Sequence, residues 1–150
     1  MPEKKTIERA RKDARESKAP STQAGEFVRE EMNHIREGKH GARSAKQAIA
    51  IGLSKARRAG VKLAPPKKGR ASERTRTQAA RDSAKGAEPF RAVSRKRSRA
   101  VTSALKREGS AAASHTALSR QAHASAKSRG PADRSKAARK AAVTRARNSR

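Results

Sequence analysis

The sequence predicts an all-α protein of two unequal parts: a small N-terminal helical hairpin module over residues 1–64, and a basic tail over 65–150. Large apolar residues concentrate in the first part, whereas the longer second part consists mainly of Ala, Ser, Lys and Arg. Pro65 and Pro66 lie at the boundary between the two parts and are predicted to form a hinge. Only the first part therefore has enough apolar side chains for a core, and a core of that size is small.

Charged residues of alternating sign over 5–17 predict a first helix, with Thr6 as its cap. The pattern breaks around Pro20, and Ser21 is a favourable N-cap for a second helix over 21–37. One face of this second helix is apolar and spans an arc of about 140° at ~100° per residue. That stripe consists of Phe27, Val28, Met32 and Ile35.

Ser44 and Gln47 have the spacing of a capping box for a third helix over 45–59. Gly52 and several alanines would let the second helix approach this one closely, so the two helices are expected to form an αα-hairpin. Glycines are placed to end both helices, at Gly38 and Gly60. Two apolar residues are placed to fold back over the open end of the hairpin, namely Val61 and Leu63.

The tail has three segments with helical spacing: 91–107, a segment that Ser110 would cap, and a segment that starts at Pro131 with Asp133 in its first turn. Alanine favours helix, but cations at i,i+4 repel each other. We therefore expect a tail that is largely disordered when free and conditionally helical, gaining helix when phosphates neutralise its charge.

Charge is the strongest functional signal. The chain has 40 Lys and Arg against 13 Asp and Glu, a net charge of +27, of which +8 lies in residues 1–64 and +19 in 65–150. Such an excess predicts a polyanionic partner. With two aromatic residues in all, Phe27 and Phe90, the chain lacks the stacking platforms of many RNA-binding modules. No stretch has the length of about 20 apolar residues that spans a bilayer, and no secretory signal is visible.

The sequence predicts neither a catalytic site nor a metal-binding site. The absence of cysteine excludes thiolate metal sites and disulfides. The four histidines lack metal-ligand spacing: they are His34, His40, His115 and His123. Nothing fixes a general base beside a serine, so we expect no catalytic residue, no metal, no cofactor and no enzymatic activity.

Phosphate contacts are expected from cations of the third helix, the loop before it and the tail. The acids of the hairpin lie on its second helix, which leaves the third helix basic. The predicted nucleic-acid-binding residues are Lys39, Arg43, Lys46, Lys55, Arg57, Arg58, Lys67, Lys68, Arg95, Lys96, Arg97, Arg99, Arg139 and Lys140.

The segment GKHGARSAKQAIAIGLSKARRAGVKL, at residues 38–63, resembles a group of small basic bacterial proteins known only as a domain of unknown function. The resemblance extends over roughly residues 1–69 and implies no established activity or site residues. The tail is similar in composition to the tails of linker histones and bacterial histone-like proteins.

These observations predict sequence-nonspecific DNA binding by a nucleoid-associated or histone-like protein of the cytoplasm. One alternative is an RNA-binding or ribosome-binding protein, since the composition suits either polyanion. Another is an adaptor that docks a protein partner through the 21–59 hairpin, where Ile51 lies off the main apolar stripe. A membrane partner is not expected, because the tail lacks an apolar stripe with Trp or Phe.

Overall fold

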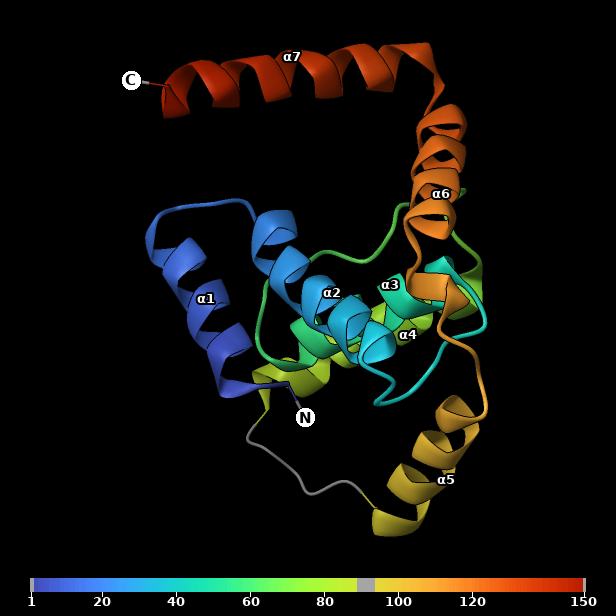
Figure 1. Cartoon of the computed structure of the whole chain (residues 1–150). Coiled ribbons are helices and arrows are strands. Elements are labelled where there is room, and N and C mark those ends of the chain that lie inside the picture. Colours follow the sequence, from blue (N-terminus) through green and yellow to red (C-terminus); the bar gives the residue numbers. More distant parts are fainter. Residues whose placement is uncertain (1, 89–93, 150) are drawn as a thin grey trace. The chain divides into compact units, whose positions relative to one another are not determined.

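The computed structural model describes residues 2–88 and 94–149, which are helical over most of their length (Figure 1). Its elements are α1 (Lys4–Arg15), α2 (Pro20–Arg36), α3 (Ala45–Arg58), α4 (Glu73–Ala87), α5 (Arg95–Lys106), the 3-10 turn η1 (Ala111–Ala113), α6 (His115–Ser128) and α7 (Gly130–Asn148). They belong to two compact units, residues 1–114 and 115–150. The prediction of an all-α protein is confirmed.

The predicted disorder of the tail is wrong, because helices α4 to α7 lie within it. Alanine, the residue of highest helix propensity, recurs throughout these segments. Repulsion between cations four residues apart costs only about 0.2–0.5 kcal/mol per pair. At the start of α4 the Ser72 hydroxyl also accepts a hydrogen bond from the Thr75 N–H at 3.2 Å. Propensity and capping therefore outweigh like-charge repulsion.

The first two helices begin differently from the prediction. The N-cap of α1 is Glu3, and Thr6 is buried inside the helix instead of capping it. The first residue of α2 is Pro20, whose fixed φ and missing N–H suit a first turn, so Ser21 is not the N-cap. Ser17, with a φ of 54°, turns the chain between the two helices.

The α2–α3 hairpin forms as predicted. Three residues of the α2 stripe are buried, namely Phe27, Met32 and Ile35. The helices approach each other closely where Gly52 of α3 meets α2, since a Cβ on Gly52 would lie 2.7 Å from the Cα of Val28. The missing side chain of this glycine therefore permits the close packing of the two helices.

The expected cap and stops of the hairpin are also present. Ser44 accepts a hydrogen bond from the Gln47 N–H at 3.2 Å, while the Gln47 side chain accepts from the Arg43 N–H at 2.9 Å. Gly38 and Gly60 have φ values of 71° and 91°, which glycine adopts most readily, and they follow the ends of α2 and α3.

Substituting Gly52→Ala is expected to destabilise the protein by about 1–3 kcal/mol, because the new methyl group overpacks the contact with Val28. Gly25→Ala in α2 is the matched control, since its Cβ would meet no atom within 4 Å. At position 25 the higher helix propensity of alanine should stabilise the protein by about 0.5–1 kcal/mol. Urea unfolding followed by circular dichroism measures both, and equal effects of the same sign would contradict the packing argument.

A small core joins α1 to the hairpin. Among the described residues, its buried members are Ala10, Ala24, Phe27, Ala56 and Val61. Partly buried side chains pack against it from Ile7, Leu53 and Leu63. The chain after α3 therefore folds back over the hairpin, as Val61 and Leu63 predicted.

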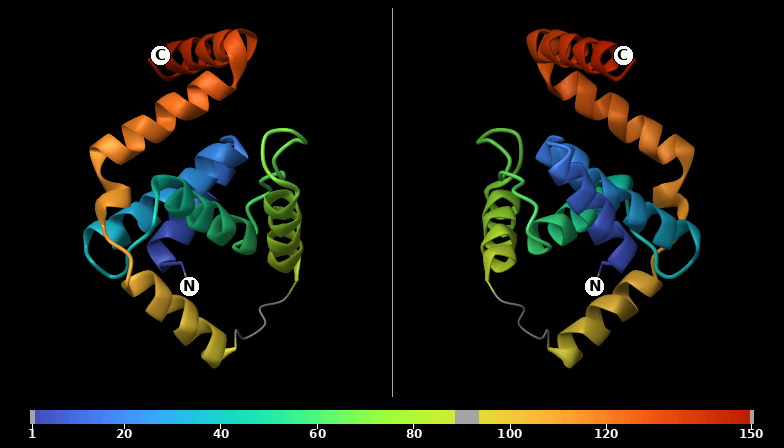
Figure 2. Two further views of the ribbon diagram at one scale, coloured as in Figure 1. Left: turned by 90° about the vertical axis from the view of Figure 1, so that its right-hand side faces the viewer. Right: turned by 90° about the vertical axis from the view of Figure 1, so that its left-hand side faces the viewer.

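Helix α4, from the predicted tail, packs beside α3 (Figures 1 and 2). Its buried Asp82 accepts hydrogen bonds from Ser54 Oγ at 2.7 Å and from Arg58 Nε at 2.8 Å. A Cβ on Gly86 would clash with the carbonyl oxygen of Arg57, so the two helices also touch through a glycine. Sequence from the tail thus completes the packing of the N-terminal module.

Residues 105–113 also join the first unit. The N–H of Gly41 donates to the Leu105 carbonyl at 2.9 Å, and Arg36 Nε donates to the carbonyl of the fully buried Ala113 at 3.0 Å. A Cβ on Gly41 would clash with the Glu108 carbonyl oxygen. The first compact unit therefore continues past residue 64, the predicted end of the module, to residue 114.

The tail segments are helical at positions close to those expected. α5 covers 95–106 of the expected 91–107, and Val93 lies outside the described residues. Ser110 precedes η1 and makes no side-chain cap hydrogen bond, so it does not cap α6.

The second unit consists of α6 and α7, which meet at a bend (Figure 1). Gly130 has a φ of 74°, and Pro131 lies in the first turn of α7 with Asp133, as predicted. None of the described side chains of α6 and α7 is buried. Nearly all described side chains of α7 are exposed, whereas several of α6 are half-buried.

Candidate functional site

Exposed cations lie along helices α5 and α7. The first two turns of α5 carry four exposed cations and no acid: Arg95, Lys96, Arg97 and Arg99. On α7, Arg139 and Lys140 are exposed, and the sequence of this helix has a single acid, Asp133. Exposed positions are also found for Arg43, Lys46, Lys67 and Lys68.

Other predicted DNA contacts have partners within the protein. Lys39 Nζ lies 2.9 Å from Glu37, and Arg58 lies 2.8 Å from Asp82. Arg57, also predicted as a phosphate contact, is buried and donates to the backbone carbonyls of residues 63 and 64. Desolvation lowers the pKa of this guanidinium. The chain that folds back after α3 covers it, a contact that helical periodicity does not reveal.

Two carboxylates of α2 are buried in the first unit. Glu31 is 0 % exposed and Glu30 is 5 % exposed. Lys55 of α3, another predicted DNA contact, places its Nζ 2.6 Å from Glu31 Oε2 and 3.5 Å from Glu30 Oε1. One ammonium group is therefore shared by two buried carboxylates and balances only one of their two negative charges. Buried charges need such partners, since an unpaired one is costly to desolvate.

Two histidines lie beside this carboxylate pair. His40 Nε2 is 3.4 Å from Glu31 Oε1, and the rings of His34 and His40 meet edge to face with their centroids 6.0 Å apart. One potential ligand atom each from Glu31, His34 and His40 lies within 4.8 Å of the other two. The three side chains form a compact cluster at the C-terminal end of α2 and the loop that follows.

Hydrogen bonds orient both imidazole rings. His40 Nδ1 lies 3.1 Å from the Gly41 carbonyl, an acceptor, so Nδ1 carries the proton. His34 Nε2 lies 2.9 Å from the Glu3 carboxylate, which holds the proton on Nε2 in the same way. Contacts with His34, and then with Lys39, lower the pKa of Glu3.

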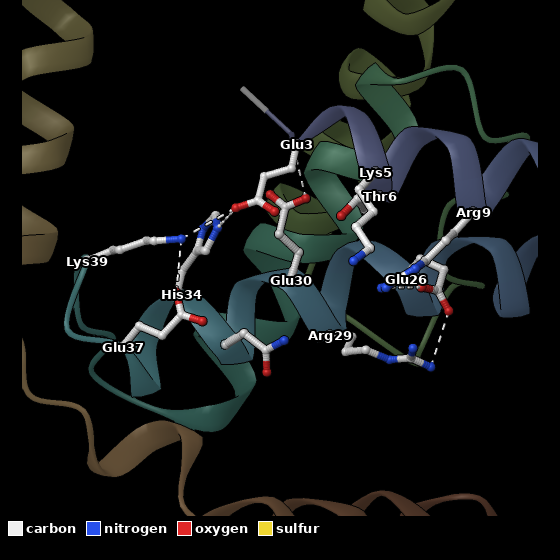
Figure 3. A pocket seen from close by; sticks show the side chains of 11 residues that line it. Glu3, Lys5, Thr6, Arg9, Glu26, Arg29, Glu30, His34, Glu37 and Lys39 are labelled. Atoms are coloured by element: carbon white, nitrogen blue, oxygen red, sulfur yellow. Dashed lines mark hydrogen bonds and ion pairs between the residues drawn. The ribbon is translucent and has the colours of Figure 1, made fainter.

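A polar groove between α1 and α2 borders the cluster (Figure 3). At one end Glu3 points toward His34 and Lys39, and its backbone N–H donates to Glu30 at 3.1 Å. Further along, Glu26 pairs with Arg9 at 3.7 Å and with Arg29 at 3.2 Å. Acids and cations alternate along this groove, so its surface lacks the one-sided charge of α5 and α7.

Two of the four histidines, His34 and His40, lie close together and beside Glu31, a proximity that their spacing in the sequence did not predict. His34 and His40 meet because the turn at Gly38 reverses the chain after α2. The sequence did contain one signal, since Glu31 and His34 are three residues apart and share a helical face. Ile51, which supported the adaptor alternative, is partly buried.

The fold and these sites define an all-helical protein whose compact N-terminal unit contains a buried polar cluster and whose helices α5 and α7 carry exposed cations. Residues 20–68 match a family of unknown function, DUF6496, which confirms the resemblance over the α2–α3 hairpin and the chain that follows it. No curated protein and no solved structure matches the chain.

Among the described residues, none of the helices combines the length and the apolar character needed to cross a membrane.

Proposed function

We propose that the protein binds DNA without sequence specificity, through phosphate contacts of its exposed basic helices. The observation that supports this most is the distribution of charge: residues 94–150 contain sixteen Lys and Arg against two acids, Glu108 and Asp133. The α5 and α7 cations considered above are exposed. Contacts of this kind position a protein on a duplex and release counterions, but they read no bases.

The shape of α7 suits this role. An α-helix fits the major groove of B-DNA, and α7 has 19 residues with no described side chain buried. At about 100° per residue, Lys136, Lys140 and Arg147 fall within roughly 40° of one another, and Arg139 lies close by. One face of α7 therefore presents four cations to a phosphate backbone.

The hairpin has a different charge pattern. Its acids pair with Arg9, Arg29, Lys39 and Lys55, so these cations are already neutralised within the fold. We therefore assign the main DNA contacts to α5 and α7 and a supporting role to exposed Arg43, Lys46, Lys67 and Lys68. Binding of this kind would place the protein on a bacterial nucleoid.

Neutralising one face of α7 tests this assignment. The variant Lys136→Gln, Arg139→Gln, Lys140→Gln, Arg147→Gln is expected to bind duplex DNA about 100-fold more weakly at ~0.15 M salt. The matched control removes the same charge from paired or hairpin positions: Arg9→Gln, Lys12→Gln, Arg29→Gln, Lys39→Gln. Fluorescence anisotropy with a labelled duplex measures both, and circular dichroism checks that both stay helical.

An equal loss in the two variants would mean that only net charge matters and would remove α7 as the binding surface. A duplex RNA of the same length serves as competitor. If it displaces DNA at a much lower concentration than unlabelled DNA does, the natural partner is RNA and not DNA.

A further inference from the structure

We propose that Glu31, His34 and His40 bind a divalent transition-metal ion of the zinc type. Two imidazoles and a carboxylate are a donor set that suits zinc. Their potential ligand atoms lie within 4.8 Å of one another, on the last two turns of α2 and the adjoining loop. This site lies in the N-terminal unit and does not depend on the proposed DNA binding.

The tautomers leave one nitrogen of each ring free for a metal. With its Nδ1 proton donated to the Gly41 carbonyl, neutral His40 carries its lone pair on Nε2, the atom that faces Glu31. With its Nε2 proton donated to Glu3, neutral His34 carries its lone pair on Nδ1. Metal-binding histidines usually donate their other N–H to a carboxylate or a backbone carbonyl. Both partners are present here.

The charge of the cluster favours a cation. Glu30 and Glu31 are buried, and Lys55 supplies one positive charge to the two carboxylates. With neutral histidines, one negative charge is left over. Lys55 occupies Oε2 of Glu31, so that Oε1 remains for a metal, and this buried oxygen has no hydrogen-bond donor among the described residues.

The distance between His40 Nε2 and Glu31 Oε1 also suits a shared metal. Zinc–nitrogen and zinc–oxygen bonds of about 2.0–2.1 Å place two tetrahedral ligands about 3.3 Å apart. The observed separation is 3.4 Å. Three protein ligands leave a fourth position, which water or another donor would fill.

Metal binding is tested on the full chain without a polyhistidine tag. After treatment with EDTA and its removal, equilibrium dialysis should show one Zn²⁺ per chain, and Zn²⁺ should raise the Tm by about 5 °C or more. Mg²⁺ should do neither, because it prefers oxygen ligands. Co²⁺ should give the visible absorption bands of a tetrahedral site.

Two histidine variants and their matched controls locate the site. His34→Gln and His40→Gln should each lower Zn²⁺ affinity by roughly 100-fold or more, and Glu3→Gln, which removes a positioning residue, by about 10-fold. His115→Gln and His123→Gln, both in α6, should leave the affinity unchanged. Equal losses in the α6 variants, or no loss in His40→Gln, would overturn the proposal.

A measurement on the unmodified chain covers the case in which a variant fails to fold. Long-range ¹H–¹⁵N spectra of the histidine rings should show Zn²⁺ shifting the nitrogens of His34 and His40 while those of His115 and His123 stay in place. Shifts of all four rings to a similar extent, or of none, would show that the cluster is not a metal site.

Discussion

The DNA affinity of the full chain is expected to fall by about 10³-fold as monovalent salt rises from roughly 50 to 200 mM. Each Lys or Arg that contacts a phosphate releases condensed counterions, and the slope of log K against log salt is about −0.9 per contact. Six contacts therefore give a slope of about −5. The cations of α5 and α7 are numerous enough to supply them, since residues 94–150 contain sixteen.

Anisotropy titrations on two unrelated duplexes of about 25 base pairs measure this slope across the salt range, and phosphate contacts predict the same result for both. The α7 variant with four glutamines should show a slope shallower by about 3–4. A wild-type slope no steeper than about −2 would rule out a surface of many phosphate contacts. A large preference for one duplex would point to base readout instead.

Replacing Lys55 by methionine is expected to cost about 3–5 kcal/mol of the free energy of unfolding. The substitution keeps the apolar stem but removes the only cation found within 4 Å of Glu31 among the described lysines and arginines. Glu30 and Glu31 would then remain buried with their charge uncompensated. The loss is large because the penalty is the desolvation of the remaining carboxylates.

Urea unfolding in the presence of EDTA measures this cost without any contribution from bound metal. Lys46→Met is the matched control, since Lys46 lies on the same helix and is exposed; it should change stability by no more than about 0.5 kcal/mol. The double variant Lys55→Met, Glu31→Gln should recover part of the loss by removing one buried charge. Equal, small effects of Lys46→Met and Lys55→Met would show that the ion pair between Lys55 and the buried glutamates contributes little to the free energy of unfolding.

Local signals were sufficient to predict the hairpin. The apolar stripe of α2, the Ser44 cap of α3 and the glycines at 38 and 60 each act within a few residues, so the sequence displays them directly. The start of α2 was misplaced because Pro20 and Ser21 are both favourable near a helix start, and Pro20 takes the first helical position.

The tail was predicted less well because the repulsion between its cations was overestimated relative to the helix propensity of its alanines. Alanine propensity and cation repulsion act on the same residues, and the helices of residues 73–148 show that propensity prevails. The docking of α4 and of residues 105–113 on the hairpin could not be predicted. It depends on glycines at 41 and 86 and on the buried Asp82, which meet partners more than 20 residues away.

Composition and periodicity by themselves determined that this protein is helical, strongly basic and equipped with a capped hairpin. Only the tertiary structure decided which charges remain available. Lys55 and Arg57 are two residues apart on one basic helix, yet one is paired with buried Glu31 and the other is covered by the chain that follows α3. His40 likewise meets Glu31 and His34 only because the chain reverses at Gly38. Ion pairs and metal-ligand sets depend on the distances between side chains in the folded protein. These distances cannot be read from the separation of the residues along the chain, because folding brings distant residues together.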